Sequence, residues 1–150
     1  MTSLNTPPAS QPDGILLFAH GSRDPLWKRP MEAVAARIAS AQPQLHVACA
    51  YLELCEPSLP DAAAQMIAQL NQSTINTIAI CADSMPVSGS KCLRIRILPM
   101  FLGMGKHARE DLPEITAQLR ARHPAVIFEI APAVGEDERV IALLAQLATA

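Results

Sequence analysis

The chain is poor in aromatic residues and carries little net charge. Phe, Trp and Tyr together make up 3% of its 150 residues, and the formal net charge at pH 7 is −2. Proteins that bind single-stranded nucleic acid stack bases on aromatic side chains, and nucleic-acid-binding domains in general carry a basic patch. The composition therefore disfavours a general polyanion binder, and we expect no nucleic-acid partner.

Long apolar runs and export signals are also missing. No apolar run approaches the roughly 20 residues that cross a bilayer, so we expect no membrane partner. Residues 1–13 are polar and contain proline, and they lack the basic and apolar segments of a signal peptide. We interpret residues 1–13 as a flexible N-terminal tail and expect a cytoplasmic protein.

Neither cysteine nor glycine forms a recognisable binding motif. The cysteines lack the C-x-x-C spacing of many metal sites, and we interpret them as reduced, mostly structural thiols. They are Cys49, Cys55, Cys81 and Cys92. No Gly-x-Gly-x-x-Gly or P-loop pattern is present, which disfavours a flavodoxin-like nucleotide binder.

Short apolar runs alternate with amphipathic segments, and half of the residues are hydrophobic, enough for one domain over residues 14–150. The runs and periodicities predict strands at 14–19, 45–52 and 126–130, and helices at 30–42, from Ser58 onward, at 109–122 and after 136. This order predicts an α/β fold of three layers. We expect a mainly parallel sheet of four to five strands with helices on both faces.

The middle of the chain leaves two interpretations open. Two apolar runs, Thr77–Ala82 and Leu93–Leu98, follow each other with a loop-like connector between them. Either both are strands, or one is the core strand and the other lies outside the sheet. We favour Arg94–Phe101 as the core strand. The alternation of Arg94 and Arg96 with isoleucines suggests one solvated face near a sheet edge.

Two histidines follow apolar runs at the points where strands are expected to end. His20 follows residues 15–19, and His107 lies a few residues after the run 97–102. In an open α/β sheet, ligands bind at the carboxyl ends of the strands. Two neutral imidazoles meeting there could ligate a divalent metal and leave most of its coordination sphere open.

Three segments around these histidines resemble, in order, the motifs of the small class II chelatases. They are Ala19–Pro25, Tyr51–Pro60 and Leu98–Pro113, and the resemblance covers roughly residues 14–149. It implies a chelatase-like half-domain that is commonly a homodimer. It also implies sirohydrochlorin cobaltochelatase or ferrochelatase activity, in which a metal replaces two protons of sirohydrochlorin in cobalamin or sirohaem biosynthesis.

The resemblance also implies roles for individual residues. His20 and His107 would ligate the metal and accept protons, and Glu53 or Glu56 would complete the metal site. Candidate substrate contacts are Gly21, Ser22, Arg23, Lys106 and Arg109, the basic ones facing the carboxylates of the macrocycle. We interpret His46 and His123 as structural. No organic cofactor is expected, because the metal is itself a substrate.

Two questions stay open at this stage. Residues 76–92 resemble an insertion relative to the family, and displacement of the following strand would misplace His107. The metal is also not specified by these ligand types, which accept cobalt, iron and nickel, and we favour Co²⁺ over Fe²⁺ on the resemblance alone. A non-catalytic tetrapyrrole- or metal-binding carrier is the alternative to an enzyme.

Overall fold

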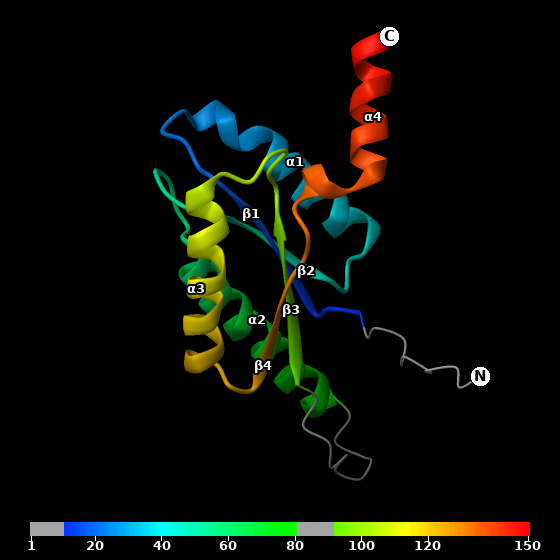
Figure 1. Cartoon of the computed structure of the whole chain (residues 1–150). Helices are drawn as coiled ribbons and strands as arrows, with labels where there is room; N and C mark the ends of the chain where they lie inside the picture. The colour runs from blue at the N-terminus through cyan, green and yellow to red at the C-terminus, as the bar shows by residue number, and fades with distance from the viewer. Residues whose placement is uncertain (1–10, 81–91) are drawn as a thin grey trace, which may run out of the picture.

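The computed structural model of the chain describes residues 11–80 and 92–150, and it contains a four-stranded parallel sheet of order β2-β1-β3-β4 (Figure 1). The strands are β1 (Gly14–Ala19), β2 (His46–Tyr51), β3 (Leu93–Pro99) and β4 (Val126–Ile130). The helices are α1 (Arg29–Ala41), α2 (Leu59–Ile80), α3 (Lys106–Arg122) and α4 (Glu138–Thr149), with 3-10 turns η1 (Pro25–Lys28) and η2 (Val134–Glu136). The predicted α/β class and parallel sheet are confirmed.

Helices cover the two faces of the sheet unequally. On one face, α2 and α3 enclose a core that includes Phe18 of β1, Ile97 of β3 and Phe128 of β4. On the other face, α1 packs over Leu17 and Tyr51 of β1 and β2. α4 packs chiefly against η2 and projects from the body of the molecule (Figure 1). The second face is therefore covered by a helix over β1 and β2 only.

Local side-chain contacts define where the helices begin. Ser58 precedes α2, and its hydroxyl accepts a hydrogen bond from the backbone N–H of Asp61 at 3.3 Å while pairing with the Asp61 carboxylate at 2.5 Å. Asp24 caps η1 in the same way, accepting from the N–H of Leu26 at 2.9 Å. Such caps satisfy backbone donors that have no partner within the helix, as expected for the serine that the sequence placed at this helix start.

The strand interpretation of Thr77–Ala82 is wrong for the part that is described, because Thr77–Ile80 is the last turn of α2. The favoured alternative is confirmed, since the second apolar run forms β3. The rest of the suspected insertion, residues 81–91, lies outside the described residues, as do Cys81 and residues 1–10 of the expected tail.

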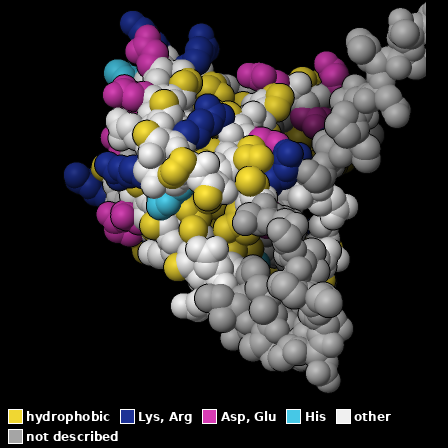
Figure 2. Space-filling view, turned by 90° about the horizontal axis from the view of Figure 1, so that it is seen from below, with side chains coloured by type: hydrophobic (Ala, Val, Ile, Leu, Met, Phe, Trp, Pro, Cys, Tyr) yellow, Lys and Arg dark blue, Asp and Glu magenta, His cyan; other side chains and the backbone are white. Residues whose placement is uncertain are grey.

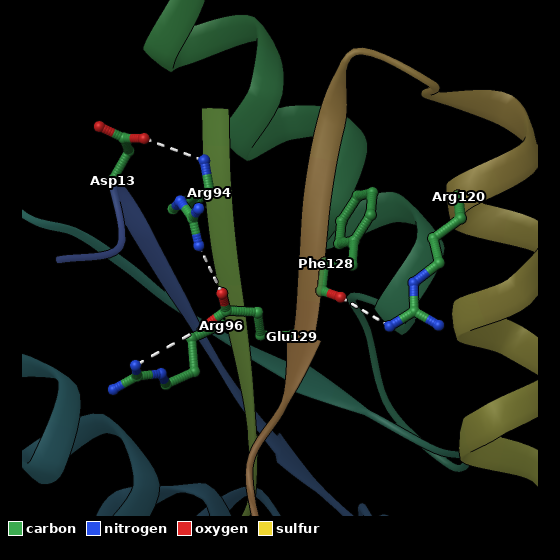
Figure 3. Close-up of polar contacts among 6 residues, drawn as sticks. All are labelled: Asp13, Arg94, Arg96, Arg120, Phe128 and Glu129. Atoms are coloured by element: carbon green, nitrogen blue, oxygen red, sulfur yellow. Dashed lines mark hydrogen bonds and ion pairs between the residues drawn. The ribbon is translucent and has the colours of Figure 1, made fainter. Parts of the chain in front are cut away.

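Arg94 and Arg96 lie on a solvated face, but β3 is not an edge strand, because it pairs with both β1 and β4. The two arginines instead flank one carboxylate on the neighbouring strand (Figure 3). Glu129 Oε1 lies 2.8 Å from Arg94 Nη1, and its Oε2 lies 3.7 Å from Arg96 Nη2. Cross-strand pairing of opposite charges thus accommodates arginines in an interior strand whose outer face has no helix over it.

The described cysteines, Cys49, Cys55 and Cys92, form no disulfide with one another; Cys49 and Cys55 are partly buried and Cys92 is exposed. Burial raises the pKa of the Cys49 thiol, which favours its protonated form.

Across residues 11–80 and 92–150, no helix has both the length and the apolar character needed to span a membrane. Seen from the end where the strands begin (Figure 2), hydrophobic side chains gather in the middle and most charged ones lie toward the margin.

Phe128 and Ile127 provide a matched test of which side of β4 faces the core. Phe128 is 2% exposed and Ile127 is 38% exposed. We expect Phe128→Ala to lower the free energy of unfolding by about 3–5 kcal/mol, because it leaves a cavity among α2, α3 and the sheet. Ile127→Ala should cost less than about 1.5 kcal/mol. Urea denaturation measures both, and equal losses would contradict the assigned faces.

Candidate functional site

The hydrogen bonding between β1 and β2 continues for two residues beyond the strands. The N–H of Leu52 donates to the carbonyl of Ala19 at 2.9 Å, and the N–H of Glu53 donates to the carbonyl of His20 at 3.0 Å. This extension places the two side chains next to each other, with His20 Nε2 3.6 Å from Glu53 Oε1. Both side chains are more than half exposed, so they are accessible to a ligand from solvent.

Gly21 allows the chain to turn away directly after His20. Its φ is +99°, in the left-handed region that favours glycine. A Cβ at this position would lie 1.9 Å from the carbonyl oxygen of Glu53, an impossible separation. The closeness of the two loops therefore depends on the missing side chain of Gly21.

His107 follows β3, the strand that lies next to β1 on the side opposite β2. The N–H of Met100, at the exit of β3, donates to the carbonyl of Phe18 at 2.7 Å, and the loop then leads to Gly105, the N-cap of α3. His107 is the second residue of α3, and Asp111 follows one turn later on the same side of the helix. The β3–α3 loop thus brings a second imidazole to the end of the sheet at which His20 lies.

These side chains line one cavity of about 360 Å³ at the carboxyl ends of the strands. Its lining residues are His20, Leu52, Glu53, His107 and Asp111. With neutral imidazoles, the two carboxylates make the lining negative, and it includes no lysine or arginine, so the cavity attracts cations. Within the described residues, no three His, Cys, Asp or Glu side chains are close enough to form a ready metal cluster. The arrangement is open and sparse in ligands.

The structure separates the two predicted glutamates. Glu53 lines the cavity, whereas the carboxylate of Glu56 accepts a hydrogen bond from the N–H of Ser58 at 3.1 Å, at the approach to α2. The backbone carbonyl of Glu56 also accepts from Lys28 Nζ at 3.3 Å. Glu56 therefore stabilises the turn before α2 and does not line the cavity.

Asp111 is a cavity residue that the sequence reasoning did not identify as part of the site. The sequence placed it near the start of a helix, where acidic residues are common. Its spacing of four residues from His107 was the available signal, because residues i and i+4 lie on one side of a helix. Using that signal requires knowing that the helix begins at Lys106, three residues before the predicted start at Arg109.

The predicted substrate-contact residues flank the cavity without lining it. Lys106 is exposed, and its Nζ lies 3.9 Å from a carboxylate oxygen of Glu110. Arg109 donates to the carbonyl of Met104 at 2.9 Å, across the loop that precedes α3. Ser22 accepts a hydrogen bond from the N–H of Asp24, and Arg23 is exposed in the same turn. Arg23 thus lies in the turn that follows His20, and Lys106 and Arg109 lie in the first turn of α3, which also bears His107.

Aromatic and cationic contacts hold η1 against the end of β2. The rings of Trp27 and Tyr51 meet edge to face, with centroids 6.2 Å apart. Lys28 Nζ lies 5.2 Å from the centroid of the Tyr51 ring. Burial raises the pKa of Tyr51 well above its ordinary value, so its hydroxyl stays protonated at neutral pH. These contacts tie together the loops that follow β1 and β2.

The CbiX family matches this chain over residues 14–81 and 85–150. The chain belongs to the CbiX family. Curated relatives include a sirohydrochlorin cobaltochelatase of Methanococcoides burtonii, 29% identical over 71% of this chain and 65% of the relative. Another, from Methanococcus aeolicus, is 28% identical over 69% of this chain and 57% of the relative. The matched region thus covers less than two thirds of these CbiX-related proteins.

Solved structures share the fold of this CbiX family member. A cobalamin (vitamin B12) biosynthesis CbiX protein of Marinobacter aquaeolei is 25% identical, with a TM-score of 0.64 over 92% of this chain and 95% of that one. The sirohydrochlorin chelatase SirB of Bacillus subtilis subspecies spizizenii, in complex with cobalt, is 20% identical. It has a TM-score of 0.67 over 93% of this chain and 50% of that one. The chain therefore corresponds in extent to the first protein and to half of the second.

Gly21 gives a direct test of how the two loops form the cavity. We expect Gly21→Ala to lower the midpoint of thermal unfolding by several degrees. The added methyl group would collide with the backbone of Glu53, and alanine would have to adopt a positive φ that is unfavourable for it. Gly103→Ala is the matched control, since a Cβ there meets no atom within 4 Å. Differential scanning calorimetry measures both variants. An unchanged midpoint for Gly21→Ala would contradict the close approach of the loops.

Proposed function

We propose that the protein is a sirohydrochlorin chelatase that inserts a divalent metal, with Co²⁺ favoured over Fe²⁺. One observation supports this most directly. Two histidines from separate motifs, with Glu53 3.6 Å from His20, line a single cavity at the carboxyl edge of the sheet. The membership of the CbiX family and the names of the curated relatives agree with this assignment.

Metal capture is assigned to His20, His107 and Glu53. Neutral imidazole and carboxylate are suitable ligands for divalent cobalt and iron. Because the cavity is open, water molecules or macrocycle nitrogens can occupy the remaining coordination positions. His107 lines the same cavity as the His20–Glu53 pair, so a movement toward that pair would bring three ligands together. We assign no ligand role to Glu56, since its carboxylate is hydrogen-bonded at the turn before α2.

Proton release is the second requirement of the reaction. Insertion forms metal–nitrogen bonds to the macrocycle and removes two pyrrole protons, so one M²⁺ replaces two H⁺ and charge is balanced. An imidazole that does not ligate the metal at that moment can accept a proton and pass it to solvent. His20 and His107 are both exposed. Each can therefore exchange a proton with bulk water.

Macrocycle binding is assigned to the residues around the cavity. Sirohydrochlorin carries carboxylates on its rim; Arg23 provides an exposed cation in the turn after His20, and Lys106 and Arg109 provide exposed cations in the first turn of α3. Gly21 and Ser22 would let the macrocycle approach the backbone of the β1–α1 loop. No organic cofactor takes part in this scheme.

The biological setting follows from the same proposal. Insertion of cobalt serves cobalamin biosynthesis, and insertion of iron serves sirohaem biosynthesis. We favour the first because the curated relatives are named cobaltochelatases. The homodimer stays a prediction from the family resemblance, and the cytoplasmic location stays a prediction from the sequence. Insertion rates for Co²⁺ and Fe²⁺ measured on one anaerobic preparation decide between the metals.

An enzyme and a non-catalytic carrier differ in the rate at which metal is inserted into sirohydrochlorin. Protein, sirohydrochlorin and Co²⁺ are mixed without oxygen, and the absorbance of the macrocycle is followed with time. An enzyme accelerates metal insertion over the protein-free control and turns over more than once. Stoichiometric binding without acceleration would favour a non-catalytic carrier and overturn the proposal.

His20→Ala and His107→Ala should each reduce the insertion rate to within about tenfold of the protein-free rate, because each removes a metal ligand and a proton acceptor. His123→Gln is the control. This histidine ends α3 beside Phe128, outside the cavity, so its replacement should leave the rate nearly unchanged. The absorbance assay measures all three variants after circular dichroism has verified their folding. Full activity of either alanine variant removes that residue from the mechanism.

Glu53→Gln and Glu56→Gln separate the two glutamates of the second motif. We expect Glu53→Gln to weaken Co²⁺ binding at least about tenfold, since the cavity loses one of its two carboxylates. Glu56→Gln keeps an oxygen that can accept from Ser58 and should bind Co²⁺ like the parent protein. Isothermal titration calorimetry measures both affinities. The reverse order of effects would place Glu56 in the metal site.

A further inference from the structure

Outside β4 and α4, the large hydrophobic side chains that the described residues expose lie in loops that follow strands. They are Leu26 (55% exposed) and Trp27 (37%) after β1, Leu54 (51%) after β2 and Leu102 (66%) after β3. Parallel strands end at one edge of the sheet, so these loops all leave the edge at which the cavity with the two histidines lies. We call these four the apolar loop residues. Several exposed apolar side chains at one edge indicate a binding surface.

The apolar loop residues and the cavity suit different parts of one ligand. The cavity presents two imidazoles and two carboxylates, which are groups that bind a divalent metal. Exposed apolar side chains add nothing to the binding of a hydrated ion. Cations lie in the turn after His20 and in the first turn of α3. A polar centre, apolar side chains and cations together match a flat ligand that has a metal-binding centre, apolar ring faces and an anionic margin.

Leu54 holds an unfavourable backbone conformation. Its φ is +65°, and within residues 11–80 and 92–150 no other non-glycine residue has a positive φ. The left-handed region brings the Cβ of an L-residue close to the following carbonyl oxygen, so a leucine adopts it at a cost. Asparagine or glycine would adopt the same turn more readily. The turn itself therefore does not require leucine, and strain of this kind is typical of functional positions.

Contacts of its two neighbours turn Leu54 outward. A Cβ built on Gly21 would lie 1.9 Å from the carbonyl oxygen of Glu53 and 3.3 Å from Sγ of Cys55. Cys55 also packs with the cluster between α1 and the sheet. Residues 53 and 55 are thus both held against the turn after β1, and the residue between them lies on the outside of the loop. Leu54 is half exposed as a result.

We infer that Leu54 binds one face of the macrocycle and positions its centre at the cavity, with Leu102 as a second apolar contact. The inference rests on the proposed function and names residues that select a macrocycle as the ligand of the site. Leu54 directly follows Glu53, which lines the cavity beside His20. A ring that lies on Leu54 therefore brings its central nitrogen atoms toward these two side chains.

The separation of the two leucines fits a ligand larger than an ion. Leu54 follows β2 and Leu102 follows β3, and β1 lies between those strands. Two strand spacings amount to about 10 Å. A single ion cannot bridge that distance, whereas a flat tetrapyrrole can contact both loops at once. Burial of the two side chains under the ring would also remove water from the mouth of the cavity, which strengthens the attraction between a metal and its ligands.

A titration with metal-free sirohydrochlorin, in the absence of oxygen and metal, tests the assignment of Leu54. Trp27 is the sole tryptophan of the chain, so quenching of its fluorescence reports macrocycle binding. We expect Leu54→Asn to weaken this binding about tenfold, because it removes an apolar contact while asparagine tolerates the positive φ. Leu54→Met keeps an apolar side chain and should retain most of the affinity. Equal affinities of Leu54→Asn and the parent protein overturn the inference.

Further measurements separate an apolar contact from a disturbed fold. Leu54→Asn should keep the thermal midpoint and the Co²⁺ affinity of the parent protein, since Leu54 does not line the cavity. Its loss of macrocycle affinity should persist at high salt, whereas the loss caused by Arg23→Gln should shrink as salt screens charge. Leu102→Asn should behave like Leu54→Asn. A Co²⁺ affinity that falls together with the macrocycle affinity overturns the inference. So does a change in sedimentation without a change in macrocycle binding, which would assign the apolar loop residues to a protein partner.

The same variants distinguish this inference from the proposed function. A parent protein that binds sirohydrochlorin through Leu54 but does not accelerate metal insertion contradicts only the chelatase proposal. A parent protein that accelerates insertion, with an unchanged KM for sirohydrochlorin in Leu54→Asn, contradicts only the inference. A parent protein that binds no sirohydrochlorin contradicts both.

Discussion

The backbone at the exit of β1 is the constraint on which the site depends. The carbonyl of Phe18 accepts a hydrogen bond from the chain leaving β3, and those of Ala19 and His20 accept from the chain leaving β2. Three consecutive carbonyl groups, two at the end of β1 and one directly after it, therefore align three loops. A parallel sheet makes this possible because all its strands end at the same edge. Without these bonds, His20, Glu53 and His107 would belong to independently moving loops.

Much of the fold could be predicted from the sequence because short apolar runs in a parallel sheet are local signals. β1 and β4 have the bounds that their apolar runs predict, and Ser58 marks the approach to α2. The end of α2 could not be predicted in this way. Thr77–Ile80 contains β-branched residues that favour strands, but the helix begun at Leu59 continues through them. A preceding helical turn thus outweighed the intrinsic preference of these residues.

The residues of the candidate site that follow a strand in the sequence could be predicted from the sequence. Both histidines were identified because each follows an apolar run, and the structure places both on one cavity. The choice between Glu53 and Glu56 depended on a tertiary contact of Glu53, whose N–H donates to the carbonyl of His20, and on a local turn in which Glu56 accepts from the N–H of Ser58. The contact with His20 has no signature in the local sequence. Asp111 depended on where α3 begins, which the loop after β3 determines and the periodicity alone does not.

The exposure of the cavity bears on how such a site could transfer a metal. Opposite unit charges 4 Å apart attract by about 1 kcal/mol in water and by about 4 kcal/mol near a protein surface. His20 and Glu53 are more than half exposed, so solvent keeps the attraction for a cation toward the lower end of this range. A buried cluster of three or four ligands would hold a metal tightly, as structural sites do. Weak capture by few, solvated ligands favours release, because the nitrogen atoms of a macrocycle can displace them one at a time. If the proposed function holds, a backbone fixed at the exit of β1 with exposed side chains beyond it would satisfy both needs: the ligands would be positioned, and the metal would not be trapped.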